Sequence, residues 1–413
     1  MKRGIDVDRI DPEFLMELSD PIEAVYEAIE HDLLMQLAKR FDGRKVPKSK
    51  VPGSTAWRAY MLEQIGGLSE DNIRLIAAYT GDVSELTQLA VRLAVETAID
   101  AVEPELAKMV RRPEYVPERS ATAQRVIESY AAQALNQLNL VNTVMLNSSL
   151  RAYEQAVNDT VAYQTKLETA QKALNEQTGA VIMGAVSRQK AVENAVKRMA
   201  SVGLTGFTDA GGRNWSAQAY VQMDIRTTAA NAARQAVLDR NEAHGNNLIS
   251  VSSHPGARPL CAPYQGKVFS TDGTAGTVED LHGKSVEYTP LSLTSYGQPA
   301  GLFGINCGHL PSPFIPGVSI VRSVEYSLKE NAAAYEQTQQ QRFMERRVRR
   351  LNTQADVLEA AGDAEGAKAL RGKARQATAD LMDWCRSNGR DFYPDRIAIV
   401  RGAERRDERF LKG

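Results

Sequence analysis

"GLFGINCGHLPSPFIPGVS", residues 301–319, is the stretch that decides the fold, because it interrupts a chain that is otherwise typical of helices. Four glycines and three prolines favour turns and end helices. The same stretch carries Cys307 and His309 with one residue between them. A metal site, a catalytic loop and a purely structural set of turns are the three interpretations open at this point.

The prolines divide the chain into two helical regions around a turn-rich block. None occurs between Pro117 and Pro255, eight occur from Pro255 to Pro316, and the next is Pro394. Because proline lacks the N–H that a helix needs, long helices are expected on both sides of residues 246–320 and not within them.

The N-terminal region, residues 1–118, is expected to be a helical bundle. Asp20 is a candidate N-cap, Pro21 follows at the first helical position, and Glu23 completes a capping box. This pattern predicts that the first helix begins at Pro21. The Pro- and Lys-rich stretch 43–54 is expected to be a linker inside the bundle.

Long helices are expected over residues 119–245. The part from 120 to 177 contains no helix breaker, which allows a helix on the order of 85 Å long. Its many amides, as in "LNQLNLVNTVMLNSS" (135–149), favour packing against other long helices. Two shorter helices folded back on each other are the alternative. Another helix is expected over 215–243.

Residues 246–320 have a different composition. "NLISVSS", "KVFS" and "SVEYTPLSL" are typical of short strands, and aromatic and branched residues alternate with the glycines and prolines. We therefore expect a compact α+β domain here. The predicted fold class is mainly α with this one small α+β domain.

Residues 321–413 predict a C-terminal αα-hairpin and a tail. Met344, Val348, Leu351 and Leu358 belong to a row of apolar residues spaced by three and four, and a matching row follows the turn "AAGDAEG". Two such rows are expected to pack against each other.

The first helix of this hairpin carries the most basic segment of the chain, "RFMERRVRR" (342–350). Its five arginines are expected on the outer face of the helix. Contact with DNA phosphates is one interpretation, and a solvated helix flank is the other. The arginines are Arg342, Arg346, Arg347, Arg349 and Arg350.

Composition excludes several classes of function. The 50 basic and 51 acidic residues leave a net charge of -1, so no overall field attracts nucleic acid or membrane. No apolar run approaches the roughly 20 residues of a membrane span, and the polar N-terminus is unlike a signal peptide. Three cysteines argue against a disulfide framework and fit a reducing, cytoplasm-like compartment.

Cysteines and histidines gather in the turn-rich block. Four of the five histidines and two of the three cysteines lie between residues 244 and 309. The best candidate set for structural zinc is His254, Cys261, Cys307 and His309, because thiolates and imidazoles are its usual ligands. Buried thiols and hydrogen-bonded histidines without a metal are the alternative. A catalytic Cys/His pair finds no supporting motif.

Two longer strings carry a family resemblance: "VSSHPGARPLCAPYQGKVFS" (251–270) and "YGQPAGLFGINCGHLPSPFIPGVS" (296–319). They resemble the core of the phage minor capsid protein 2 family, which is itself similar to the Mu protein F-like head morphogenesis proteins. The resemblance implies a structural virion component at the portal vertex, assembled in the host cytoplasm, with no established enzymatic activity. It also implies a histidine in similar proteins at the position of Cys261, an exchange that zinc ligation tolerates.

The expected function is therefore that of a minor head protein acting in head morphogenesis and in DNA packaging or ejection. The expected partners are the portal protein, further copies of the chain and, as further candidates, the major capsid protein and packaged DNA. Two alternatives stay open. One is a Cys/His-dependent enzyme or toxin-like effector on a Mu F-like scaffold, and the other is a sequence-independent DNA-binding virion protein.

Overall fold

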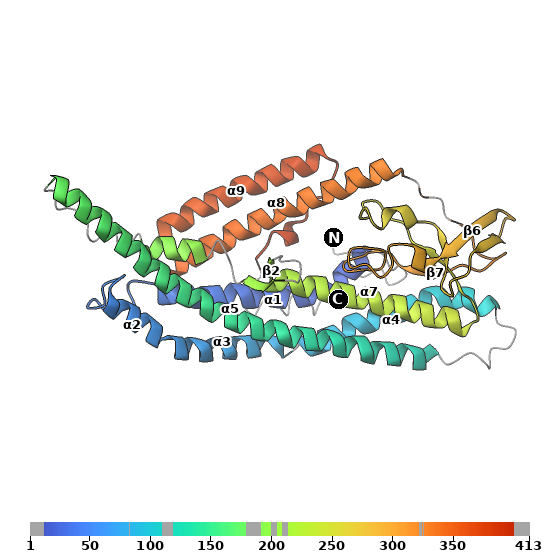
Figure 1. Ribbon diagram of the computed structural model, residues 1–413, viewed down its shortest axis with the longest axis horizontal. Helices are drawn as coiled ribbons and strands as arrows, with labels where there is room; N and C mark the ends of the chain where they lie inside the picture. The colour runs from blue at the N-terminus through green and yellow to red at the C-terminus, as the bar shows by residue number, and fades with distance from the viewer. Residues whose placement is uncertain are drawn as a thin grey trace.

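The computed structural model confirms the mainly α fold with a small α+β domain (Figure 1). It describes residues 12–81, 83–109, 119–178, 191–199, 205–208, 214–321, 324 and 326–399. The α-helices are α1 (Pro12–Arg40), α2 (Thr55–Glu63), α3 (Ile65–Thr80), α4 (Val83–Leu106), α5 (Arg119–Thr178), α7 (Ala217–Ala243), α8 (Leu328–Ala360) and α9 (Ala364–Ser387), with a helical segment over 191–199. The strands are β1 (Thr205–Thr208), β2 (Asn214–Ser216), β3 (Leu248–Val251), β4 (Val268–Ser270), β5 (Gly276–Glu279), β6 (Ser285–Pro290) and β7 (Pro311–Pro313).

The longest element is α5, a single helix of 60 residues. At 1.5 Å per residue it is about 90 Å long, and its C-terminal part extends beyond the neighbouring helices (Figure 1). The alternative of two helices folded back on each other is wrong. A continuous buried stripe supports the helix over much of its length: Ala134, Leu138, Val141, Met145, Tyr153, Ala156 and Val157.

The start of α1 differs from the sequence-based prediction. The helix begins at Pro12 and runs through Pro21, so Asp20 is not its N-cap. An interior proline costs about 3 kcal/mol. Phe14, Leu15 and Leu18 are buried ahead of it, and each such side chain contributes about 1.5–3 kcal/mol. Burial in the core therefore outweighs the local signal for a helix start.

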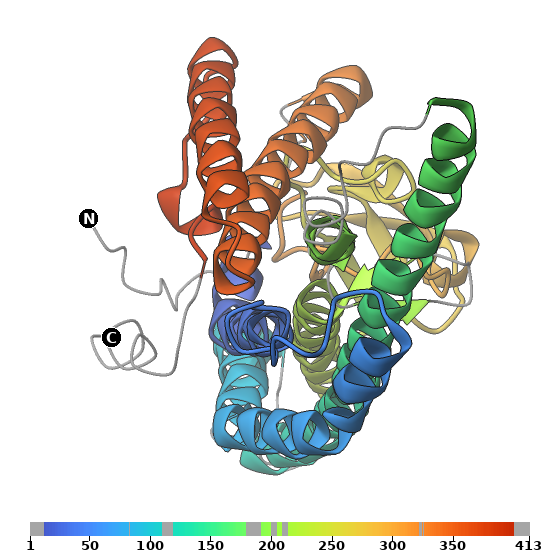
Figure 2. The same cartoon turned by 90° about the vertical axis from the view of Figure 1, so that its left-hand side faces the viewer.

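One hydrophobic core joins the helical regions. Residues of α1, α4, α5 and α7 belong to the same buried cluster, and Val357 and Leu358 of α8 join it. The regions 1–118 and 119–245 thus share a core. Figure 2 shows α1 and α7 near the middle of the bundle, with the α8–α9 hairpin and the C-terminal part of α5 rising on opposite sides.

The α+β domain contains a five-stranded sheet in the order β5-β6-β4-β3-β7. The pair β4 and β6 is parallel, and the other neighbours are antiparallel. The strands expected at β3, β4 and β6 are confirmed, whereas β5 and β7 were missed. β7 contains Pro311 and Pro313, and it lies at the edge of the sheet, where a missing N–H is tolerated.

The predicted C-terminal hairpin is confirmed, and it is attached to the rest of the molecule at both ends. Near its start, Asn331 exchanges two hydrogen bonds with the backbone of Ala257, at 2.9 and 2.7 Å. Near its turn, His31 of α1 contacts Asp356 of α8. Gly362, with φ of 89°, makes the turn between the two helices.

His31 lies between two carboxylates. Its Nε2 is 3.1 Å from Asp356 Oδ2, and its Nδ1 is 3.1 Å from Asp32 Oδ1. Asp32 also accepts from Tyr79, and Asp356 pairs with Arg371 at 3.0 Å. Burial lowers the pKa of His31, but the hydrogen bonds and charges of the carboxylates outweigh it and raise the pKa from 6.5 to about 8. A protonated His31 therefore stabilises the attachment of the hairpin.

We predict that this attachment weakens as the pH rises from about 6.5 to above 8. The pKa of His31 is higher in the folded protein than in the unfolded chain. Protonated His31 therefore contributes about 2 kcal/mol to the free energy of unfolding below pH 6.5, and this contribution is lost as the pH passes 8. Urea unfolding measured across this range should show the decline in the native protein. His31→Gln should remove it, and the exposed His282→Gln should not. If the free energy of unfolding fell equally with pH in the native protein and in His31→Gln, the prediction would be contradicted.

Candidate functional site

Two loops of the α+β domain and helix α7 build the Cys/His cluster. The first loop follows β3 and carries His254 and Cys261, and the second precedes β7 and carries Cys307 and His309. Because β3 and β7 are neighbours in the sheet, with Val251 paired to Pro311, the two loops meet at one end of the domain. Pairing of two distant strands thus brings together residues that lie 46 positions apart.

Three of the four predicted ligands converge. Cys261 Sγ is 3.9 Å from Cys307 Sγ, which is 3.3 Å from His309 Nδ1. The three potential ligand atoms lie within 4.8 Å of one another. The side chains are 1–3% exposed, and both cysteines are free thiols. His254 lies outside this group: its ring packs 4.4 Å from that of His309, while its Nδ1 faces the carbonyl of Pro255 at 3.2 Å.

Gln265 orients the cluster. Its Oε1 accepts from the backbone N–H of His254 at 2.7 Å and from the Tyr326 hydroxyl at 3.1 Å, and it lies 3.1 Å from His309 Nε2. A carbonyl oxygen only accepts, so Nε2 of His309 carries the hydrogen. Nδ1 is therefore the ring nitrogen that faces Cys307 Sγ, at 3.3 Å. No sequence pattern indicates this role, because a glutamine in a loop is usually a surface residue.

Arg234 of α7 holds the second loop. Its guanidinium donates to the backbone carbonyls of His309 at 2.9 Å, of Phe303 at 3.2 Å and of Cys307. It also donates to Asn231 Oδ1 at 2.7 Å. The side chain is buried, and this burial lowers its pKa to about 10. Sequence reasoning missed Arg234, because an arginine in a helix is normally on the surface.

The environment makes the two cysteines different. A hydrogen bond from Cys261 lowers the pKa of Cys307 far below its usual range; His309 and Arg234 act in the same direction, against burial. The N–H of Phe303 also donates to Cys307 Sγ, at 3.2 Å. The pKa of Cys261 is raised by its hydrogen bond to Cys307 and by burial. Two cysteine sulfurs and one imidazole thus form a buried donor set, which can bind a soft metal ion but does not offer an exposed nucleophile.

The second loop depends on unusual backbone conformations. Phe303 and Asn306 have φ of 59° and 55°, in the left-handed region, which asparagine adopts more readily than most residues. The N–H of Asn306 donates to Thr227 of α7 at 3.0 Å. At Gly301 an added Cβ would overlap the carbonyl oxygen of Ser295.

We predict that Gly301→Ala destabilises the protein by about 1–3 kcal/mol, because backbone atoms must move to admit the methyl group. The matched control is Gly67→Ala in α3, where an added Cβ meets nothing within 4 Å. Removing an exposed helical glycine should be neutral or stabilising by up to about 1 kcal/mol. Chemical denaturation measures both effects, and equal effects of the two substitutions would refute the steric role of Gly301.

The basic segment of α8 is divided between two faces. Arg346, Arg347 and Arg350 are exposed, as expected. Arg342 and Arg349 are partly buried and turn toward α1: Arg349 Nη1 is 3.8 Å from Glu23, and Arg342 donates to Met16 Sδ at 3.4 Å. The expectation that all five arginines lie on the outer face is therefore wrong for these two.

The reason is the helical period, since residues seven positions apart share a face and that face of α8 packs against α1. Contact of the remaining three arginines with DNA stays a prediction.

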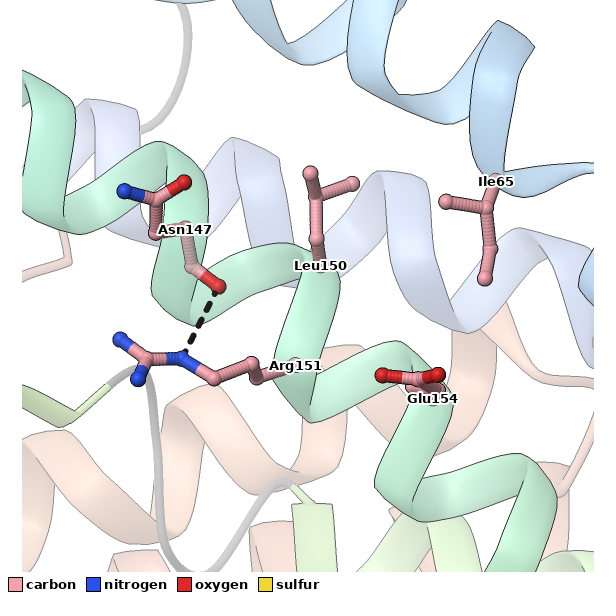
Figure 3. Close-up of a pocket in the computed structure, with 5 residues that line it drawn as sticks. All are labelled: Ile65, Asn147, Leu150, Arg151 and Glu154. Carbon is pink, nitrogen blue, oxygen red and sulfur yellow. Dashed lines mark hydrogen bonds between the residues drawn. The ribbon is translucent and has the colours of Figure 1, made fainter.

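A surface depression lies elsewhere, between α5 and the start of α3 (Figure 3). In it Arg151 Nε donates to the backbone carbonyl of Asn147 at 3.3 Å. The lining residues are Ile65, Asn147, Leu150, Arg151 and Glu154. Since this set lacks a nucleophile paired with a base, it supports no catalytic interpretation. Within the described parts of the chain, no helix has the length and apolar character needed to cross a membrane.

Comparisons with known proteins connect these features to a family. The chain is similar to a structural protein of Lactococcus phage LL-H, with 29% identity over 320 residues that cover 74% of this chain and 78% of that protein. It is also similar to a structural protein of Lactococcus phage mv4, with 41% identity over 64 residues, which are 16% of this chain and 52% of that protein. No solved structure matches it.

The model of the family described as phage minor capsid protein 2 matches residues 10–386. This match begins just before α1 and ends in α9, so it includes the helical body, the Cys/His cluster and the hairpin. The chain belongs to the phage minor capsid protein 2 family.

Proposed function

We propose that this chain is a structural component of the virion that acts at the portal vertex in head morphogenesis and in DNA packaging or ejection. The observation that carries the proposal is the family match over residues 10–386, together with relatives that are structural proteins of phages. The expected partners are the portal protein, further copies of the chain and the major capsid protein. Assembly would take place in the host cytoplasm.

The outer face of α5 supports a protein partner. Residues 130–150 contain no charged side chain, although part of this helix faces solvent. Of its amides, Asn142 points inward and accepts from Tyr26 at 2.9 Å. The exposed residues are Ala132, Gln133, Asn136, Asn139, Leu140, Thr143 and Asn147. Depletion of charge is typical of the centre of a protein interface.

We predict that the chain comigrates with its portal protein after co-expression, in both sizing and sedimentation. Leu140→Glu places a charge on the uncharged face of α5 and should weaken the complex at least about tenfold. The matched control is Leu89→Glu on α4, since both leucines are 50% exposed. Separate migration of the two native proteins, or equal weakening by both substitutions, would count against this face as the contact surface.

Contact with DNA is a second candidate function, and the observation that favours it is the exposure of Arg346, Arg347 and Arg350 on one segment of α8. Because the net charge of the chain is -1, any such contact has to be local. It would be independent of DNA sequence, since exposed arginines on one helix flank suit phosphates.

Replacing Arg346, Arg347 and Arg350 by alanine should weaken DNA binding at low salt. The slope of log affinity against log salt should also become shallower, by about one for each phosphate that the variant no longer neutralises. The control replaces the exposed arginines Arg74, Arg92 and Arg151 of the body, which removes the same charge elsewhere. Fluorescence anisotropy with a labelled duplex measures both quantities. Absence of binding at low salt would end this candidate.

The enzymatic alternative has little support. Cys307 is 3% exposed and His309 is 1% exposed, so a substrate would reach them only after the two loops separate. Catalysis by a Cys/His pair needs an accessible nucleophile. We therefore place the chain among the structural proteins.

A further inference from the structure

We propose that Cys261, Cys307 and His309 together bind one zinc ion. The inference goes beyond the proposed role in the virion, and it stands on the geometry of the three side chains. Among the described residues, these three form the group of potential metal ligands whose donor atoms lie within 4.8 Å of one another.

Two of the three separations between the ligand atoms fit tetrahedral zinc, and the third, between Cys261 Sγ and His309 Nδ1, is within 4.8 Å. With Zn–S bonds of about 2.3 Å and Zn–N bonds of about 2.0 Å, two sulfur ligands are roughly 3.8 Å apart, and a sulfur and a nitrogen roughly 3.5 Å. Cys261 Sγ and Cys307 Sγ are 3.9 Å apart, and Cys307 Sγ and His309 Nδ1 are 3.3 Å apart. The two thiol groups are therefore spaced as ligands of one ion.

The hydrogen bond of His309 also supports a metal site. Nε2 of His309 donates to Gln265, which leaves Nδ1 as the atom that can bind a metal. Metal-binding histidines characteristically use their second nitrogen in such a bond, which fixes the ring and its tautomer. Three soft donors therefore face one another, and the hydrogen bonds that orient a ligand are already in place. Metal binding would displace the remaining thiol protons into solvent.

Hydrogen bonds already fix the backbone around the three ligands. Arg234 donates to the carbonyls of Cys307 and His309, and the N–H of Phe303 donates to Cys307 Sγ. A loop that is fixed in this way loses little entropy when it binds an ion. The ion in turn would fasten the loop before β7 to the loop after β3, and so would stabilise a domain whose sheet consists of strands of three to six residues.

His254 has a different role in this assignment. The sequence suggests it as the fourth ligand, but His254 is not in the group whose ligand atoms all lie within 4.8 Å of one another. Its ring packs on that of His309, and its Nδ1 faces the carbonyl of Pro255. We assign the fourth position to a solvent molecule. His254 would then support the ring of His309 without binding the ion.

The experiment uses the full chain, purified under reducing conditions and washed with a chelator, to which zinc or cobalt is returned. Elemental analysis should find about one zinc per chain. Cobalt should give an intense near-ultraviolet band from thiolate-to-metal charge transfer, together with the visible bands of a tetrahedral site. The cobalt spectrum reports the thiolates in the native protein directly, so the test does not depend on whether a variant folds.

Variants then identify the ligands. Cys261→Ala, Cys307→Ala and His309→Ala should each lose stoichiometric zinc, and Gln265→Leu should weaken binding about 10- to 100-fold. The controls Cys385→Ala, in α9, and His282→Ala, at an exposed loop position, should retain one zinc. His254→Ala should also retain it, and loss of zinc in that variant would overturn the three-ligand assignment.

Two results would overturn the site itself. The first is reduced native protein that takes up neither zinc nor cobalt in stoichiometric amount. The second is a disulfide between Cys261 and Cys307, found by mass spectrometry of unreduced protein, that is retained when the chain is prepared with reductant and zinc.

Discussion

The arrangement of the α+β domain on the helical body depends on the hydrogen bonds of Arg234. A buried guanidinium on α7 donates to three backbone carbonyls of the loop before β7, and so attaches the α+β domain to the helical body. Without it, carbonyl groups would be buried without partners, at about 1–3 kcal/mol each. The positive charge of Arg234 also favours the thiolate form of Cys307, so the same side chain connects the fold with the chemistry of the cluster.

Further contacts hold the helical body, the α+β domain and the C-terminal hairpin together. Helix α7 runs through the centre of the bundle and contacts α1, α4 and α5, and β7 packs against α7 and α4. The C-terminal hairpin is held at one end by the α+β domain, through Asn331 and Ala257, and at the other by α1, through His31 and Asp356. On α5, residues 130–150 carry no charged side chain, and this stretch exposes amides and Leu140 to solvent.

Local sequence patterns predicted much of the fold because they reflect interactions between residues that are close together in the chain. A run of about sixty residues without glycine or proline forms one helix, α5, and the apolar spacing around Val348 forms the seam of the hairpin. Local signals failed where distant contacts outweighed them. Pro21 lies within α1 because Phe14, Leu15 and Leu18 are buried in the core, and Arg342 and Arg349 face inward because α8 packs on α1.

For the Cys/His cluster, the sequence by itself determined which kinds of ligand are present, because it gives the residue types and shows that they lie in turn-rich loops. It identified Cys261, Cys307 and His309 as possible ligands of one site. Only the tertiary structure decided that His254 stands apart and that Gln265 and Arg234 orient the others. The physical reason is that strand pairing between β3 and β7, and packing on α7, set these distances, and neither leaves a trace in the spacing of residues along the chain.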